Sequence, residues 1–189
     1  MQAMNVNDLF LENDNCLTLA VTSGKGGVGK SNLVANLALQ LGRRGKKVMV
    51  LDADMGMANM DVILGVRPRY TLYHVIEGRK DLLQTVTSVT QNVKLIAGGS
   101  GIMGLADLEI ERRNRIFESL KKIRQYTDIL LIDTGAGLSP NVLDFLQYSH
   151  EVLLVSTPEP TSMADAYGII KAMNQLFTSC TCIVMNKCK

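Results

Sequence analysis

The sequence predicts an α/β protein with a mostly parallel β-sheet flanked by helices. Short apolar runs rich in β-branched residues alternate with amphipathic segments, which is the pattern of consecutive βαβ units. Most of these runs are apolar at both odd and even positions, as parallel strands buried on both faces must be. With 189 residues, 47% of them hydrophobic, the chain has the size of one domain, and no repeat, linker or low-complexity tract divides it.

The individual elements follow from the spacing of the apolar residues. Strands are expected at residues 17–22, 47–51, 93–97, 128–132, 151–156 and 181–185. A helix is expected at 30–43, because Leu33, Leu37 and Leu41 recur at helical spacing and Gly45 follows as a stop signal. Two further helices, each with one apolar stripe, are expected at residues 109–125 and 162–176.

The two ends of the chain differ from its middle. Residues 1–16 are expected to be an extension, and residues 17–189 the folded domain. The last run, CIVMNKCK, contains the end of a strand that the pattern predicts to be central, and no closing helix follows it, so we expect the natural domain to continue past Lys189. The cysteines fit a reduced compartment and are expected to be small buried hydrophobes, because they lack the C-x-x-C spacing of a zinc or redox site; they are Cys16, Cys180, Cys182 and Cys188.

Charge and hydropathy exclude several classes of protein. A net charge of +2 and a pI of about 8.3 do not indicate a general nucleic-acid binder. The longest aliphatic runs, at 129–132 and 152–155, are far shorter than the roughly 18 residues of a membrane span. The N-terminus is acidic where a signal peptide would be basic. We therefore expect a cytoplasmic protein.

Residues 23–32 read SGKGGVGKSN and contain a phosphate-binding loop. Gly24, Gly29, Lys30 and Ser31 fit the pattern G-x-x-x-x-G-K-[ST] between an expected strand and an expected helix, which is the context that this motif requires. Backbone N–H groups surround the phosphates, Lys30 reaches the β- and γ-phosphates, and the Ser31 hydroxyl binds Mg²⁺. The predicted nucleotide-binding residues are Gly24, Lys25, Gly26, Gly27, Val28, Gly29, Lys30, Ser31 and Asn32.

A second lysine, Lys25, is not needed to bind one triphosphate. The stretch KGGVGKS at 25–31 resembles the signature of the deviant Walker A ATPases of the MinD/ParA class, which have the SIMIBI-type P-loop NTPase fold. The resemblance implies a nucleotide-sandwich dimer in which Lys25 crosses to the phosphates of the other subunit. Cations supplied in this way contribute on the order of 10³ to 10⁵ in rate. The alternative is an ordinary solvated lysine.

Two acidic motifs supply further candidates. The stretch DADMGMANMDVILG begins where a strand ends, so Asp52 and Asp54 emerge at the ligand-binding edge of the sheet. In the family pattern, Asp54 orients the attacking water and Asp52 lies near the Mg²⁺ shell, although a turn residue is the alternative for Asp52. The stretch DILLIDTGAG ends its strand at Asp133, the Walker B position, which would hold Mg²⁺.

The final strand is followed by Asn186 and Lys187, which resemble the first half of the N-K-x-D base-recognition motif of GTPases. The fourth position is Lys189, a donor that cannot accept the guanine N–H groups, so adenine is favoured. In the MinD/ParA family an asparagine at the position of Asn186 contacts the adenine. ATP with Mg²⁺ is thus the predicted ligand, and Lys25, Lys30 and Asp54 are the predicted catalytic residues.

Several longer stretches are similar to one branch of this class, the MinD-like flagellar number regulators (FlhG, also called FleN). They include TLYHVIEGRKDL, LIAGGSGIMGLADL and STPEPTSMADAYGIIKAM. The resemblance implies an ATPase that dimerises with ATP, docks reversibly on the inner face of the cell membrane and acts through the SRP-type GTPase FlhF, flagellar C-ring proteins or a flagellar transcription regulator. The membrane-targeting helix of this branch would lie past Lys189. The N-terminus keeps only Gln2-Ala3 of the FlhF-activating D-Q-A-x-x-L-R motif.

Proteins with other functions share this predicted fold and are alternatives. A ParA-type partition ATPase would bind DNA, but Glu109, Glu111 and Glu118 each stand four residues before a basic residue, which is typical of a solvated helix face. We therefore expect no nucleic-acid partner. A MinD-type division-site ATPase and a switch without useful turnover also remain alternatives. An iron–sulfur carrier would need cysteines that bridge a dimer, and none lies between Cys16 and Cys180.

Overall fold

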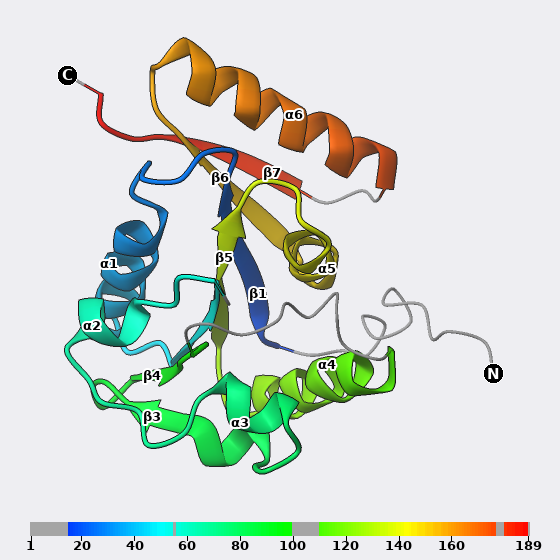
Figure 1. Cartoon of the computed structure of the whole chain (residues 1–189). Helices are drawn as coiled ribbons and strands as arrows, with labels where there is room; N and C mark the ends of the chain where they lie inside the picture. Colours follow the sequence, from blue (N-terminus) through cyan, green and yellow to red (C-terminus); the bar gives the residue numbers. More distant parts are fainter. Residues whose placement is uncertain (1–14, 55, 100–109, 177–179, 189) are drawn as a thin grey trace.

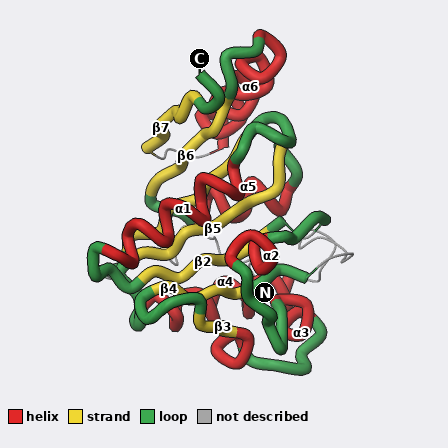
Figure 2. Tube along the Cα trace, turned by 90° about the vertical axis from the view of Figure 1, so that its left-hand side faces the viewer, coloured by secondary structure: helices red, strands yellow, loops and turns green. Residues whose placement is uncertain are grey.

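The described part of the chain folds around one seven-stranded sheet. The computed structural model describes residues 15–54, 56–99, 110–176 and 180–188. Within these residues the strand order is β3-β4-β2-β5-β1-β6-β7, and every neighbouring pair is parallel except β3 with β4. Figure 2 shows the strands side by side, with β3 and β7 at the two ends of the sheet. The strands are β1(Leu17–Ser23), β2(Val48–Ala53), β3(Val86–Ser88), β4(Val93–Ile96), β5(Ile129–Ala136), β6(Glu151–Ser156) and β7(Cys180–Met185). The predicted fold class is confirmed.

Helices cover both faces of this sheet (Figure 1). They are α1(Lys30–Arg43), α2(Met60–Leu64), α3(Leu72–Ile76), α4(Ile110–Arg124), α5(Pro140–Tyr148) and α6(Pro160–Leu176), with a 3₁₀ helix, η2(Leu82–Thr85). One buried cluster joins the sheet to α1 through Val34 and Ala38. The other joins it to α4, α5 and α6, through residues such as Phe117, Phe145 and Ile169. The core therefore lies on both sides of the sheet, as the two-sided apolar strands predicted.

The register of the central strands sets up the site. Strand β5 pairs with both β2 and β1, so Asp133 lies opposite Asp52 on one side and Val21 on the other. Helix α1 begins at Lys30, immediately after the loop that follows β1. Since parallel strands end at the same edge of a sheet, these residues meet at its carboxyl edge.

Five elements were not expected from the sequence. Strand β3 has only three residues, and α2, α3 and η2 are short, so none shows a full period of apolar residues. Helix α5 did have a start signal, because Ser139 caps the Val142 N–H and Pro140 occupies the first helical turn.

The expectation for β7 and its cysteines needs correction. Within the described residues β7 is an edge strand, not a central one. Cys16 is buried as expected, but Cys180 and Cys182 on β7 and Cys188 beyond its end are exposed. Among the described residues no helix is long and apolar enough to cross a bilayer.

Candidate functional site

The phosphate-binding loop, residues 24–29, connects β1 to α1 and depends on its glycines. Gly27 and Gly29 have φ angles of 76° and 96°, in the left-handed region that glycine adopts most easily. Gly24 faces another constraint, since a Cβ there would lie 2.5 Å from the Cβ of Asp165 on α6. The loop therefore has the conformational freedom and the close packing that this motif requires.

A cavity of about 640 Å³ opens beside this loop. The loops that follow β1, β2 and β5 contribute to it, together with the first residues of α1 and α5. Its walls include several predicted site residues, and the full lining is Ser23, Gly26, Gly27, Gly29, Lys30, Ser31, Asn32, Ala53, Asp54, Gly56, Met57, Asn59, Ile63, Gly135, Ala136, Ser139, Asn141 and Val142. Lys25, Asp52 and Asp133 do not line it.

A buried ion pair lies at the floor of the site. The Nζ atom of Lys30 is 2.7 Å from Oδ1 of Asp133, and both side chains are almost completely buried. The other carboxylate oxygen, Oδ2 of Asp133, is buried and has no hydrogen-bond partner among the described residues. Burial raises the pKa of Asp133, while the Lys30 charge and its hydrogen bond, and then the Ser31 hydroxyl, act to lower it.

These residues fit a magnesium ion. Mg²⁺ binds hard oxygen ligands and keeps several waters, so one carboxylate and one hydroxyl beside a triphosphate are a sufficient protein contribution. Oδ2 of Asp133 and the Ser31 hydroxyl offer that combination. The unpartnered carboxylate oxygen is the observation that favours the ion.

Asp52, which lies opposite Asp133 on the adjacent strand, binds backbone N–H groups and not, among the described residues, a lysine. Its Oδ1 accepts a hydrogen bond from the Asp54 N–H at 3.2 Å, and its Oδ2 accepts from the N–H groups of Asn59 and Met60 at 3.1 and 3.0 Å. Burial raises the pKa of Asp52 from 3.8 to about 6, against the effect of these hydrogen bonds, and the Asp133 charge raises it further. The carboxylate thus holds the loop after β2 in shape, while its place near Mg²⁺ stays a prediction.

Asp54 lies on the cavity wall in that same loop. Its Oδ1 accepts a hydrogen bond from the Met57 N–H at 3.2 Å, and a Cβ on Gly135 would lie 3.7 Å from that oxygen. The loop after β2 therefore approaches the end of β5 at Asp54. Asp54 thus shares one cavity with Lys30 and Ser31, and its role in orienting water stays a prediction.

Lys25 lies at the rim and contacts its own chain. Its Nζ is 3.2 Å from Oε2 of Glu159, and the two side chains are 47% and 61% exposed. Glu159 precedes α6, in the loop after β6. Sequence reasoning missed Glu159, and the available signal was its position three residues after a buried parallel strand, where ligand-binding loops lie.

Asn186 and Lys187 lie behind the P-loop. The Nδ2 of Asn186 donates to the carbonyl of Val28, and the Nζ of Lys187 donates to the carbonyl of Gly27, both at 2.8 Å. The structure therefore brings the residues after β7 to the P-loop, while the contact of Asn186 with adenine stays a prediction. Lys187 had no predicted role.

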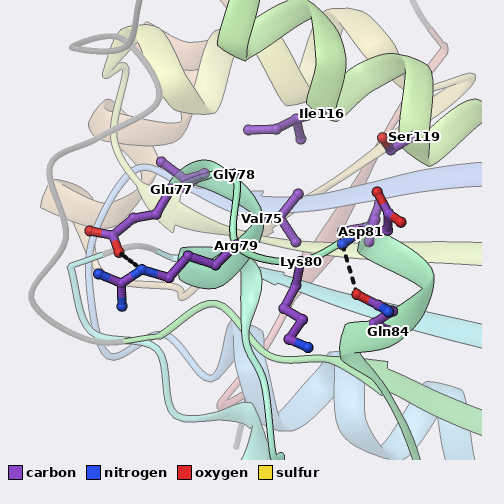
Figure 3. A pocket seen from close by; sticks show the side chains of 11 residues that line it. Val75, Glu77, Gly78, Arg79, Lys80, Asp81, Gln84, Ile116 and Ser119 are labelled. Atoms are coloured by element: carbon purple, nitrogen blue, oxygen red, sulfur yellow. Dashed lines mark hydrogen bonds and ion pairs between the residues drawn. The ribbon is translucent and has the colours of Figure 1, made fainter.

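A second cavity, of about 460 Å³, has a separate lining (Figure 3). It is enclosed by α3, η2 and α4, and its lining contains both charges, including an Arg79–Glu77 ion pair at 2.9 Å. None of the predicted site residues belongs to it. Among the described residues no group of three or more His, Cys, Asp and Glu side chains could hold a metal ion by itself.

Comparison with known proteins places this geometry in a family. Residues 17–184 match the family described as AAA domain. The chain is 43% identical over 157 residues to the antiactivator FleN of Pseudomonas aeruginosa, covering 83% of this chain and 56% of FleN. It is 38% identical over 171 residues to the flagellum site-determining protein YlxH of Helicobacter pylori, covering 90% of this chain and 58% of YlxH.

A solved relative shows the same fold with a nucleotide. The septum site-determining protein MinD of Pyrococcus horikoshii, complexed with Mg-ADP, superposes with a TM-score of 0.76 at 28% identity. The match covers 90% of this chain and 70% of that structure. The chain spans a little more than half the length of the two curated relatives, at 56% and 58%.

Proposed function

Because the chain belongs to the AAA-domain family of P-loop ATPases that includes the MinD and ParA proteins, we propose that it is a MinD-like ATPase that regulates flagellar number or placement. The observation that carries the proposal is the Lys30–Asp133 pair at 2.7 Å under a glycine-rich loop. A buried lysine and a carboxylate with one free oxygen are the two groups that a magnesium–triphosphate complex requires there.

The chain's residues divide the work of hydrolysis. The P-loop N–H groups bind the phosphates, and the Lys30 ammonium reaches the β- and γ-phosphates. Ser31 and Asp133 hold Mg²⁺, which neutralises phosphate charge when bound. Asp54 orients the attacking water, and no histidine base is needed because phosphoryl transfer depends mainly on positioning and charge.

Lys25 supplies the coupling between assembly and turnover. In the dimer that we propose, its ammonium group reaches the phosphates held by the other subunit. The contact with Glu159 must then open, and its exposure makes this easy, since exposed ion pairs contribute at most about 1 kcal/mol. A dimer of ATP-loaded subunits is therefore the hydrolysing form.

Adenine recognition is proposed for Asn186. One N–H of its amide donates to the Val28 carbonyl, and among the described residues the amide oxygen has no contact that would prevent it from accepting a hydrogen bond from a base. An acceptor suits the 6-amino group of adenine and disfavours the 6-oxo group of guanine. This supports ATP over GTP.

The flagellar role and its partners rest on the relatives. YlxH is by name a flagellum site-determining protein and FleN an antiactivator, so we propose partners of the flagellar system, namely an FlhF-type GTPase, C-ring proteins or a transcription regulator. We also propose reversible association with the inner face of the cell membrane. Replacing Asp54 by Ala in the cell should change the number of flagella per cell, and an unchanged count would contradict the flagellar role.

The biochemical test is ATPase activity against protein concentration. For the wild type we expect activity per subunit to rise with concentration, because the active form is a dimer. Lys25→Ala should lose the concentration-dependent part, and Asp54→Ala should accumulate as an ATP-bound dimer. Activity strictly proportional to protein, and unchanged in Lys25→Ala, would refute the trans-lysine mechanism.

A further inference from the structure

Two consecutive side chains beyond β7 hold two consecutive carbonyls of the P-loop. Lys187 donates to Gly27 and Asn186 donates to Val28, each at 2.8 Å. Lys187 has a φ of 55° and is the only non-glycine residue of the described chain with a positive φ. The backbone thus adopts a rarely populated conformation at the residue that reaches back to the loop.

The direction of these bonds matters because of peptide geometry. In a trans peptide the C=O and the following N–H point in opposite directions. Holding the Gly27 carbonyl outward therefore directs the Val28 N–H inward, and holding the Val28 carbonyl directs the Gly29 N–H inward. These are two of the amide groups through which a P-loop binds phosphate.

We propose that Asn186 and Lys187 are positioning residues that fix the phosphate-binding orientation of the P-loop amides before nucleotide arrives. The inference rests on the proposed ATP site and deepens it. A loop with glycines at 26, 27 and 29 has unusual backbone freedom, and freezing that freedom during binding would weaken affinity. Because Asn186 and Lys187 order the loop before nucleotide binds, part of this entropy cost no longer falls on the binding step.

Further contacts make the clamp rigid. The Asn186 N–H donates to the Ser156 carbonyl at 2.8 Å, which ties the clamp to the end of β6. A Cβ at Gly29 would lie 2.4 Å from the Nδ2 of Asn186, so the loop packs directly against that side chain. The loop is therefore held from behind by a structure that is itself anchored in the sheet.

A rival role for Lys187 is simple attraction of phosphate by its charge. The two roles differ in their response to salt, because exposed charge–charge attraction is screened whereas backbone orientation is not. The two roles also differ in the nucleotide-free protein. Only a positioning role predicts that removing the Lys187 ammonium lowers the backbone order of the empty loop.

The first test compares Lys187→Met with Lys46→Met, an exposed lysine in the turn between α1 and β2. We expect the dissociation constant for fluorescent ADP to rise about three- to tenfold in Lys187→Met and to stay unchanged in Lys46→Met. The same factor should appear at about 50 mM and about 500 mM NaCl. Lys187→Arg, which keeps N–H donors, should retain most of the affinity. A loss that disappears at high salt would overturn the proposal in favour of charge attraction.

The second test uses the nucleotide-free protein. Backbone ¹⁵N order parameters of residues 27–29 should fall in Lys187→Met and not in Lys46→Met. Unchanged order parameters together with unchanged affinity would overturn the clamp. If the wild type bound no nucleotide, the proposed ATPase function would fail, and the order parameters alone would decide whether the clamp exists.

Discussion

The two lysines of the P-loop occupy opposite environments. Lys30 lies at the floor of the site, 8% exposed, with its ammonium 2.7 Å from a buried carboxylate. Lys25 lies at the rim, with its side chain 47% exposed and 3.2 Å from a carboxylate that is more exposed still. Five positions apart in one loop, they therefore differ in how firmly the fold holds them.

The difference in burial between the two lysine–carboxylate pairs fits two different roles, one in holding phosphate and one in changing position. A buried pair that loses one partner leaves an uncompensated charge in a poorly solvated place, so the floor is held firmly. An exposed pair is exchanged for water and ions at little energetic cost. The floor is suited to retaining phosphate and the rim to a group that must leave its position, and each prediction below tests one side of this contrast.

The largest effect is expected from Lys30→Ala. Nucleotide binding should be lost, and the free energy of unfolding should fall by about 3 to 5 kcal/mol, because Asp133 is left buried without its counter-charge. Urea denaturation and fluorescent-nucleotide titration measure the two effects. As a control, the apolar pair Lys30→Met with Asp133→Leu should recover much of the stability without recovering binding. Normal binding by Lys30→Ala would refute our account of the floor.

A pH-dependent effect is expected next, from Asp52. Its pKa in the folded protein is about 6 against an ordinary value of 3.8, so the folded state binds more protons than the unfolded state between these values. Stability should therefore fall as pH rises from about 4 to about 6, by up to about 3 kcal/mol from this residue. Denaturation in EDTA across this range should show the fall in the wild type and a smaller one in Asp52→Asn. Parallel curves for the two proteins would contradict the assignment.

A smaller effect is expected from Ser31→Ala. Removing this hydroxyl should weaken Mg²⁺-dependent ADP binding by about tenfold or more, while binding in EDTA should change little. Thermal shift with ADP, with and without Mg²⁺, gives the comparison. Ser139→Ala, at another serine of the cavity wall, is the matched control and should keep the Mg²⁺ dependence. An equal loss with and without Mg²⁺ would exclude Ser31 as a ligand.

The smallest effect is expected at the rim. Glu159→Gln should change the free energy of unfolding by less than about 0.5 kcal/mol, because both side chains are largely solvated. Binding of ADP should also stay unchanged. If Glu159→Gln lowered the free energy of unfolding as much as Lys30→Ala does, the exposed pair at the rim and the buried pair at the floor would not differ as described.

The fold was predictable wherever a long periodic pattern existed. Helix α1 has the predicted bounds, Lys30–Arg43, and β6 has the predicted bounds, Glu151–Ser156. Strand β5 extends further than predicted, to Ala136, because its pairing with β2 and β1 continues past the apolar run. The position of β7 at the sheet edge could not be predicted, since strand order is set by contacts between distant segments.

The site was predictable to the extent that one motif determines it. The P-loop residues came from a contiguous pattern, and the structure brings Lys30, Ser31 and Asp54 to one cavity. The Lys25–Glu159 contact spans 134 positions and no local spacing indicates it. The hydrogen bonds of Asp52 were also hidden, because an Asp at a strand end fits a metal ligand and a loop brace equally well in sequence.

The glycine at the start of the P-loop lies directly against helix α6. A Cβ at Gly24 would lie 2.6 Å from the backbone carbonyl carbon of Asp165 and 2.8 Å from the backbone nitrogen of Ala166. Any displacement of α6 relative to the sheet would therefore change the packing around the residue where the P-loop turn begins.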